Sequence, residues 1–240
     1  MKKRWWQCLV IVMLASCNSQ EPPPADPGDD LGIKSARQKL EDNLGMISDA
    51  RQIIKDGDLV LRTGNDYSSE QIKLFSKNDQ TYSHGGIAFH DSGDIYIYHV
   101  VPDYFHVKDK VRKEKLDSFC NPSLNIGFGI ARYQMDSSEI GKFRAYLDKQ
   151  YQKQIPFDMI FDLTSDDSMY CSEMIKKGLI LATKDRIHIK NERFLDRSKF
   201  KMISIYFKMT EKQFAGKEFI PIDNLFVRPD CQVLKRYVYE

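Results

Sequence analysis

The sequence predicts a single α+β domain that follows an N-terminal targeting segment. The chain shows a helical pattern, then a cluster of strands, then further helical patterns, which is typical of an antiparallel sheet packed against helices. Neither an internal repeat nor a second linker interrupts the chain after residue 31. The part that remains has the size of one ordinary domain.

Composition and charge exclude several classes of protein. Of 240 residues, 42% are hydrophobic and 12% aromatic, which is too rich a supply of core residues for a chain disordered throughout. Lys and Arg number 36 against 34 Asp and Glu, so the basic excess of a nucleic-acid-binding protein is missing. No stretch reaches the roughly 18 apolar residues of a membrane-spanning helix. We therefore expect neither a nucleic-acid partner nor a polytopic membrane protein.

The first residues have the pattern of a secretory signal peptide. Positive residues at 2–4 precede a short apolar stretch, and the small residues Ala15 and Ser16 stand just before Cys17. This ending resembles the bacterial lipobox, in which the Cys is acylated and becomes the mature N-terminus. A plain secretion signal or an uncleaved anchor is the alternative.

These features divide the chain into a signal peptide at 1–16, the lipidated Cys17 with a Pro-rich tether over 17–30, and a folded domain over 31–240. Acyl chains contribute about 0.8 kcal/mol per buried CH₂, so the N-terminal lipid is expected to hold the domain on a membrane. The expected location is the cell envelope, on its periplasmic or surface side. Asn18 favours the outer membrane.

Hydrophobic periodicity predicts the elements of the folded domain. Helices are predicted over 36–50, 69–76, 137–151 and 170–182. Strands are predicted over 59–61, 86–90, 95–101, 105–107 and 126–133, with a tight turn at 91–94. The charged run 108–115 is predicted to be a solvated loop or helix face.

Sequence signatures of metal and cofactor sites are missing. The chain has no HExxH, no pair of CxxC motifs and no EF-hand spacing, and it lacks both a phosphate-binding glycine loop and a GxSxG motif. Asp162, Asp166 and Asp167 are interpreted as an acidic loop that caps the next helix. We expect no metal and no cofactor.

Cys171 is the candidate nucleophile. It follows a polar turn and begins an apolar-periodic helix, and with Ser168 as N-cap it would be about the third helical residue. The helix dipole and the free amide groups there favour a thiolate. The alternative is a buried structural cysteine.

Two histidines are candidates for the base that a cysteine nucleophile needs. His84 stands at the start of a strand, followed by Gly85 and Gly86, and His99 lies on the next strand. A hairpin brings the start of one strand close to the end of the next, so we expect the two histidines to be neighbours. A lone histidine in a strand is otherwise a satisfied core residue.

Five short motifs together resemble a known family. They are Gly57–Arg62, Tyr82–Ile87, Phe161–Asp162, Tyr170–Glu173 and Phe219–Asp223. In this order and spacing they resemble the permuted papain-like cysteine hydrolases of the YiiX/YebB type, which are relatives of the NlpC cell-wall peptidases and of lecithin retinol acyltransferase. The resemblance covers residues from about 54 to about 230.

The resemblance implies a circularly permuted papain-like (NlpC-like) fold. It further implies Cys171 as nucleophile, His84 as general base and His99 in the third polar position, where the permuted group often has a carboxylate. The oxyanion would be met by the Cys171 backbone N–H, with Tyr82 or Tyr170 as further candidates. Whether Cys120 and Cys231 form a disulfide is left open.

The function expected on this basis is that of an envelope-anchored cysteine hydrolase, a peptidase or amidase that forms an acyl-thioester on Cys171. Its partner would be an amide-containing envelope substrate, such as a peptide or a peptidoglycan stem peptide. Two alternatives remain open. One is a lipid acyl hydrolase or acyltransferase, and the other is a non-catalytic lipoprotein that binds a peptide or lipid.

Overall fold

The computed structural model describes residues 34–101, 110–194 and 209–240. The predicted signal peptide, the acylated Cys17, the tether and the strand at 105–107 lie outside the described residues. A compact unit runs from Ala36 to Glu240.

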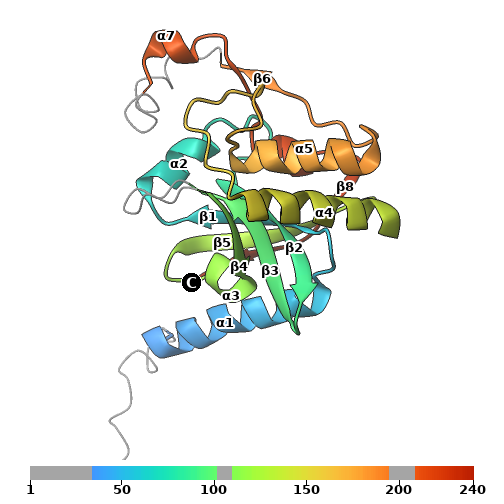
Figure 1. Ribbon diagram of the computed structural model, residues 1–240. Coiled ribbons are helices and arrows are strands. Elements are labelled where there is room, and N and C mark those ends of the chain that lie inside the picture. Colours follow the sequence, from blue (N-terminus) through green and yellow to red (C-terminus); the bar gives the residue numbers. More distant parts are fainter. Residues whose placement is uncertain (1–33, 102–109, 195–208) are drawn as a thin grey trace, which may run out of the picture. The chain divides into compact units, whose positions relative to one another are not determined.

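The centre of this unit is a six-stranded antiparallel sheet with the order β4-β3-β2-β1-β5-β8 (Figure 1). Its strands are β1 (Leu59–Gly64), β2 (His84–Asp91), β3 (Asp94–Val100), β4 (Val111–Lys115), β5 (Asn125–Tyr133) and β8 (Cys231–Val238). A small second sheet pairs β6 (Glu192–Arg193) with β7 (Glu218–Phe219). The predicted α+β class is therefore confirmed.

Helices cover both faces of the large sheet (Figure 1). One face of the sheet, called the α5 face, is covered by α4 (Ser137–Lys153) and α5 (Cys171–Thr183), which pack over strand residues such as Leu59 and Ile87. The opposite face, called the α1 face, is covered by α1 (Ala36–Ile53) and α3 (Leu116–Phe119), which pack over Val60 and Ala88. Successive strand residues point to opposite faces, which explains why neighbours in sequence belong to different cores. The shorter helices are α2 (Tyr67–Lys73), α7 (Glu211–Phe214) and α8 (Asp223–Phe226).

The hairpin of β2 and β3 has the predicted tight turn. Ser92 and Gly93 have φ values of 51° and 83°, the left-handed conformation that two-residue hairpin turns require. The register pairs Ile87 with Tyr98 and Ala88 with Ile97. It follows that the start of β2 lies beside the end of β3, as the sequence led us to expect.

Two local predictions were wrong. Residues Val111–Lys115 form β4, the edge strand of the sheet, and not a solvated loop or helix face. Edge strands are commonly rich in charged residues, which prevent pairing with another chain, so the charge run hid the strand. Helix α5 has Tyr170 as its N-cap in place of Ser168, and Cys171 is therefore its first residue.

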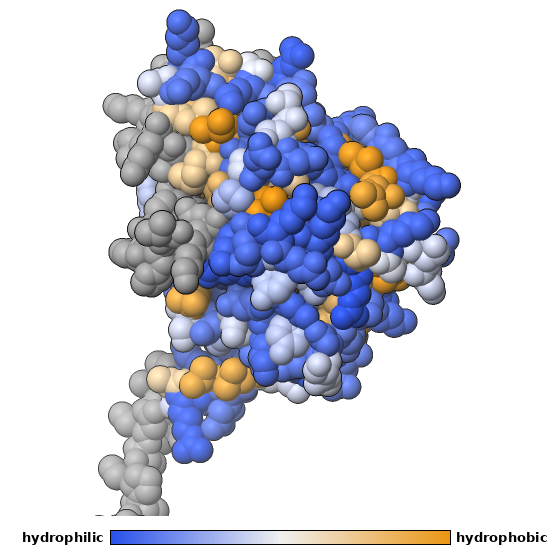
Figure 2. Space-filling model, in the orientation of Figure 1, coloured by the Kyte–Doolittle hydropathy of each residue, from blue (hydrophilic) through white to orange (hydrophobic). Residues whose placement is uncertain are grey.

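Within the described part of the chain, no helix combines the length and the apolar character needed to cross a bilayer. The face shown in Figure 2 is mostly hydrophilic, and its hydrophobic residues form small separate groups. Single exposed apolar residues are normal on soluble surfaces.

Cys120 and Cys231 are both buried free thiols. Cys120 belongs to the core under α1, whereas Cys231 belongs to the core under α5. The sheet thus separates them, and the structure does not form the disulfide that the sequence left open.

Candidate active site

Cys171 begins α5 at one end of the sheet and is 8% exposed. Its sulfur is 3.9 Å from Ser172 Oγ and is also approached by the backbone N–H of Gly85 on β2. Gly85 has no side chain to separate β2 from α5, and a Cβ there would touch Leu59, Leu61 and Ile175. The contact between the Cys171 sulfur and the Gly85 N–H places the start of α5 beside the start of β2.

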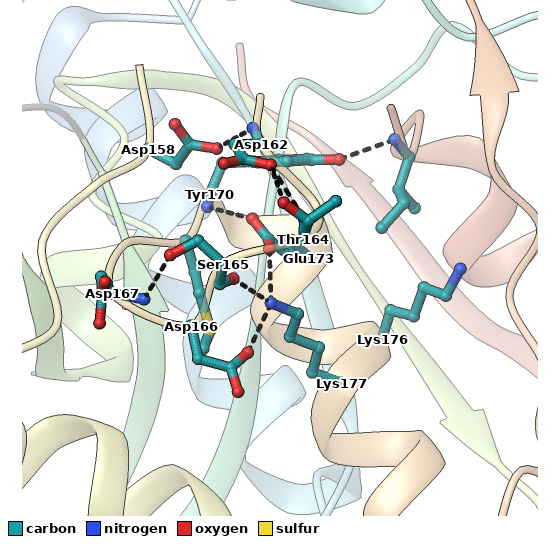
Figure 3. Close-up of polar contacts among 12 residues, drawn as sticks. Asp158, Asp162, Thr164, Ser165, Asp166, Asp167, Tyr170, Glu173, Lys176 and Lys177 are labelled. Atoms are coloured by element: carbon teal, nitrogen blue, oxygen red, sulfur yellow. Dashed lines mark hydrogen bonds and ion pairs between the residues drawn. The ribbon is translucent and has the colours of Figure 1, made fainter. Parts of the chain in front are cut away.

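The first turn of α5 is anchored by a buried carboxylate (Figure 3). Glu173 Oε2 accepts a hydrogen bond from the Tyr170 backbone N–H at 3.3 Å. Its other oxygen is 2.9 Å from Lys177 Nζ, which also contacts Asp166 at 2.7 Å. The acidic loop before α5 is thus tied to Lys177 of the helix through Asp166, but it does not cap the helix as predicted, because Tyr170 is the N-cap. Glu173 takes no part in the histidine pair.

His84 and His99 lie side by side on the α1 face. His84 Nε2 is 3.0 Å from His99 Nδ1. Gly86, between them, provides the space, since a Cβ there would lie 2.5 Å from Ile97 Cγ2 and 3.0 Å from His99 Cβ. The expected neighbourhood of the two histidines is present in the structure.

Glu114 extends this pair to a third side chain. His99 Nε2 is 3.0 Å from Glu114 Oε2, although the carboxylate lies off the direction of a hydrogen bond. Glu114 is on β4 opposite Ile97, and thus points to the same face as the histidines. Sequence reasoning missed Glu114 because it lies in the charged run taken as solvated. Only Val111 is apolar among residues 111–115, so no alternation of apolar and polar residues marks this strand in the sequence.

Arg62 on β1 places a positive charge beside the histidines. Its guanidinium lies 4.8 Å from the centre of the Phe119 ring, and that ring also packs against both imidazoles. Burial, together with the charge of Arg62, holds the pKa of His84 well below its ordinary value. Burial likewise lowers the pKa of His99, although Glu114 opposes this shift. Both rings are therefore neutral at rest near pH 7.

Burial raises the pKa of the Cys171 thiol above its ordinary value, although Ser172 and the Gly85 N–H act in the opposite direction. The side chains of Cys171 and His84, both within the described residues, are not hydrogen-bonded to each other. The direction of this pKa shift is opposite to the thiolate that the sequence led us to expect at the helix N-terminus, and desolvation is its largest cause. The pair at rest is a thiol and a neutral imidazole.

Cys171 and His84 line the same pocket. His84 is the first residue of β2, so it reaches this pocket around the end of the sheet. The walls are mainly aromatic and aliphatic, and the remaining lining residues are Ile72, Phe75, Ser83, Phe157, Phe161, Tyr170, Ser172, Phe194, Phe219, Ile220, Pro221 and Ile222. The pocket thus brings the Cys171 thiol and the His84 imidazole together with mainly apolar walls.

The two tyrosines proposed for the oxyanion lie in different surroundings, and only Tyr170 lines the pocket. Tyr82 is 1% exposed and does not line the pocket. Its ring packs on Phe226 and its hydroxyl lies against Gly129, because the segment before β2 turns this side chain into the core. Tyr170 does line the pocket, and its hydroxyl accepts a hydrogen bond from the Ile220 backbone N–H at 2.8 Å. Accepting this bond does not use the hydroxyl proton, so Tyr170 stays a candidate donor to an oxyanion beside the backbone N–H of Cys171.

The comparisons with known proteins show the fold. No family model matches the chain. No curated protein matches it either. Among solved structures, the chain is similar to the crystal structure of the metalloprotein yiiX from Escherichia coli O157:H7, with a TM-score of 0.60 and 18% sequence identity. The match covers 76% of this chain and 97% of that one, so the chain has a yiiX-like α+β fold.

That protein is named a metalloprotein, but the described residues of this chain do not fit a metal ion. Within the described ranges, no group of three or more His, Cys, Asp or Glu side chains could hold one. The ring nitrogens of His84 and His99 face each other at 3.0 Å, which leaves no space for an ion between them.

Proposed function

We propose that the chain is a cysteine hydrolase in which Cys171 attacks a carbonyl carbon and His84 accepts the thiol proton. The observation that carries this proposal is that Cys171 and His84 line one pocket, and that His99 contacts His84 from behind it. A structural cysteine would need no base beside it and no chamber in front of it.

The proposed reaction balances as acyl transfer. The sulfur adds to the carbonyl carbon while its proton moves to His84, and the oxyanion is stabilised by backbone N–H groups at the start of α5. His84 then protonates the leaving amine or alcohol as the C–N or C–O bond breaks, and an acyl-thioester remains on Cys171. Water, deprotonated by His84, releases the acid and restores the thiol.

The first candidate substrate is an amide of the cell envelope, such as a peptide or a peptidoglycan stem peptide. The support is the predicted N-terminal signal and Cys17, which would place the domain in the envelope on a lipid anchor. A second candidate is an acyl ester, and the specific observation in its favour is the apolar wall of the pocket, which suits an aliphatic or aromatic acyl group. Acyl transfer to an acceptor other than water follows the same first step.

The test is acylation of Cys171 itself. Purified protein is incubated with 4-nitrophenyl esters of increasing chain length, with aminoacyl anilides, with peptidoglycan fragments and with phospholipid vesicles. Intact-mass and peptide mass spectrometry then locate any adduct. We expect one acyl group per chain on Cys171, lost in Cys171→Ala and kept in Cys231→Ala, a matched variant of another buried thiol.

An adduct from the anilides or peptide fragments supports the amidase, and an adduct from esters or phospholipids alone supports the lipid acyl enzyme. If no substrate acylates Cys171, and Cys171→Ala releases product as fast as the unsubstituted protein, the hydrolase proposal is wrong. The remaining alternative is then a binding protein, tested by retention of the same ligands without conversion.

A further inference from the structure

The Nε2 atom of His99, on the side of the ring away from His84, needs a hydrogen-bond partner. His99 is 1% exposed, and its Nε2 is a buried atom without an aligned hydrogen bond. A buried polar atom without a partner is unfavourable, and native structures avoid it. Glu114 Oε2, at 3.0 Å, is the carboxylate oxygen that can satisfy it after a small rotation. Glu114 is partly exposed, so its side chain has room for this adjustment.

A neutral imidazole carries one N–H. The position of the proton on His99 therefore fixes which group donates and which accepts in each hydrogen bond of the row His84–His99–Glu114. If the His99 proton is on Nε2, facing Glu114, then His99 Nδ1 can only accept. The hydrogen between the two rings then belongs to His84 Nε2, and His84 Nδ1 carries a free lone pair. In the opposite direction, His99 Nδ1 donates, His84 is protonated on Nδ1, and it cannot accept a proton there.

We propose that Glu114 is a positioning residue that sets the tautomers of His99 and His84, so that the outer nitrogen of His84 is free to take the Cys171 proton. This inference rests on the proposed hydrolase function. The carboxylate is an obligate acceptor when ionised, and therefore enforces the first of the two directions. It also supplies the negative charge that stabilises the imidazolium formed during proton transfer.

The other charged groups around the pair do not substitute for Glu114. Arg62 on β1 and Arg112 on β4 both oppose a positive charge on the histidines. Burial keeps the nearby Cys120 thiol protonated by raising its pKa. Burial alone would raise the pKa of Glu114, but its contact with His99 outweighs this and lowers it, so Glu114 is ionised near neutral pH. Among the described groups that contact or perturb the two rings, Glu114 is the anion at neutral pH.

The test reads the tautomers directly. The full chain is labelled with ¹⁵N-histidine, and long-range ¹H–¹⁵N spectra distinguish protonation at Nδ1 from protonation at Nε2. Variants of the remaining histidines, His90→Gln, His106→Gln and His188→Gln, assign the signals. We expect both His84 and His99 to be protonated at Nε2 in the unsubstituted protein.

In Glu114→Gln the amide can donate as well as accept, so we expect a mixture of tautomers at both rings and a fall in acylation rate of about tenfold or more. Asp117→Asn, which alters an exposed carboxylate nearby, should leave both readouts unchanged. If Glu114→Gln does not fold, Glu114→Asp withdraws the carboxylate from His99 and should produce the same mixture.

Protonation of His84 at Nδ1 in the unsubstituted protein, or an unchanged spectrum in the Glu114 variants, would overturn the inference. The spectra are recorded on the resting protein without substrate. They therefore remain decisive even if Cys171 proves unreactive, and failure of this inference is distinguishable from failure of the proposed function.

Discussion

The two faces of the sheet bury their reactive groups in opposite ways. On the α5 face, Cys171 lies in an apolar core, and desolvation raises the pKa of its thiol. On the α1 face, His84 and His99 lie in a polar chain that ends on Glu114, with the Arg62 charge beside them. At the start of β2, His84 from one face and Cys171 from the other line the same pocket.

The two surroundings have the same consequence, because burial, joined at His84 by the charge of Arg62, keeps both the thiol and the imidazole neutral. A low-dielectric site disfavours the thiolate and the imidazolium alike. The pair is therefore not a preformed ion pair, and proton transfer from Cys171 to His84 would accompany attack on a substrate. Substitutions on one face or the other should therefore separate the contributions of the thiol and of the histidines.

The largest effect is expected from His84→Ala. Loss of the general base should lower kcat/KM for acyl transfer by about 10²- to 10⁴-fold, measured with the best ester or anilide. The control is His90→Ala on the same strand, whose imidazole contacts Asp56 at the surface. Equal rates for His84→Ala and the unsubstituted protein would show that the α1 face does not serve Cys171.

A second prediction concerns Glu173, the buried carboxylate in the first turn of α5. Burial raises the pKa of Glu173 from 4.5 to about 7, against the opposing effect of Lys177. A folded-state pKa above the unfolded one means that this contribution to stability is present below pH 4.5 and lost as pH rises through about 7.

Glu173→Gln should remove this dependence, which amounts to roughly 3 kcal/mol at most. Urea unfolding at a series of pH values measures it. The control is Glu70→Gln on exposed α2, which should preserve the pH dependence. An unfolding free energy that varies with pH equally in Glu173→Gln and the unsubstituted protein would contradict the burial argument.

Gly86→Ala should damage the histidine face. The added Cβ meets Ile97 at 2.5 Å, and we expect a loss of about 1 to 3 kcal/mol in unfolding free energy together with displacement of His99. Gly141→Ala in α4, where a Cβ meets nothing within 4 Å, is the matched control and should stabilise the protein slightly. Equal melting temperatures for the two variants would refute the steric reading.

The smallest effect is expected from Tyr82→Phe. The Tyr82 hydroxyl is buried, lacks a partner among the described residues and lies outside the pocket. Its removal should leave kcat/KM unchanged and stability equal or slightly higher. A clear fall in kcat with unchanged stability would instead restore Tyr82 as an oxyanion donor.

The sequence predicted the elements that have a clear period. The helix 137–151 and the hairpin around Ser92 and Gly93 appeared in their expected places because apolar spacing and turn residues are local signals. The adjacency of His84 and His99 followed from that hairpin. These inferences needed no knowledge of which strands pair across the sheet.

The sequence could not predict the features that depend on distant packing. Glu114 contacts His99 only because β4 adds to the edge of β3, and nothing in the charged run reveals that pairing. The thiol of Cys171 is neutral because burial in the core raises its pKa, and an argument from the helix dipole does not include this desolvation. Tyr82 is turned inward by the chain that precedes β2, which residue spacing does not show.

The most direct test of the account is the pH dependence of single-turnover acylation of Cys171, from about pH 6.5 to about pH 8.5. A neutral His84 that accepts the proton of a neutral thiol predicts a flat rate in the unsubstituted protein. It also predicts that the rate in His84→Ala rises about tenfold per pH unit, because without the base only the thiolate fraction of Cys171 reacts, and this fraction increases with pH. If the unsubstituted protein shows the same tenfold rise, free thiolate is the nucleophile and His84 is not its base.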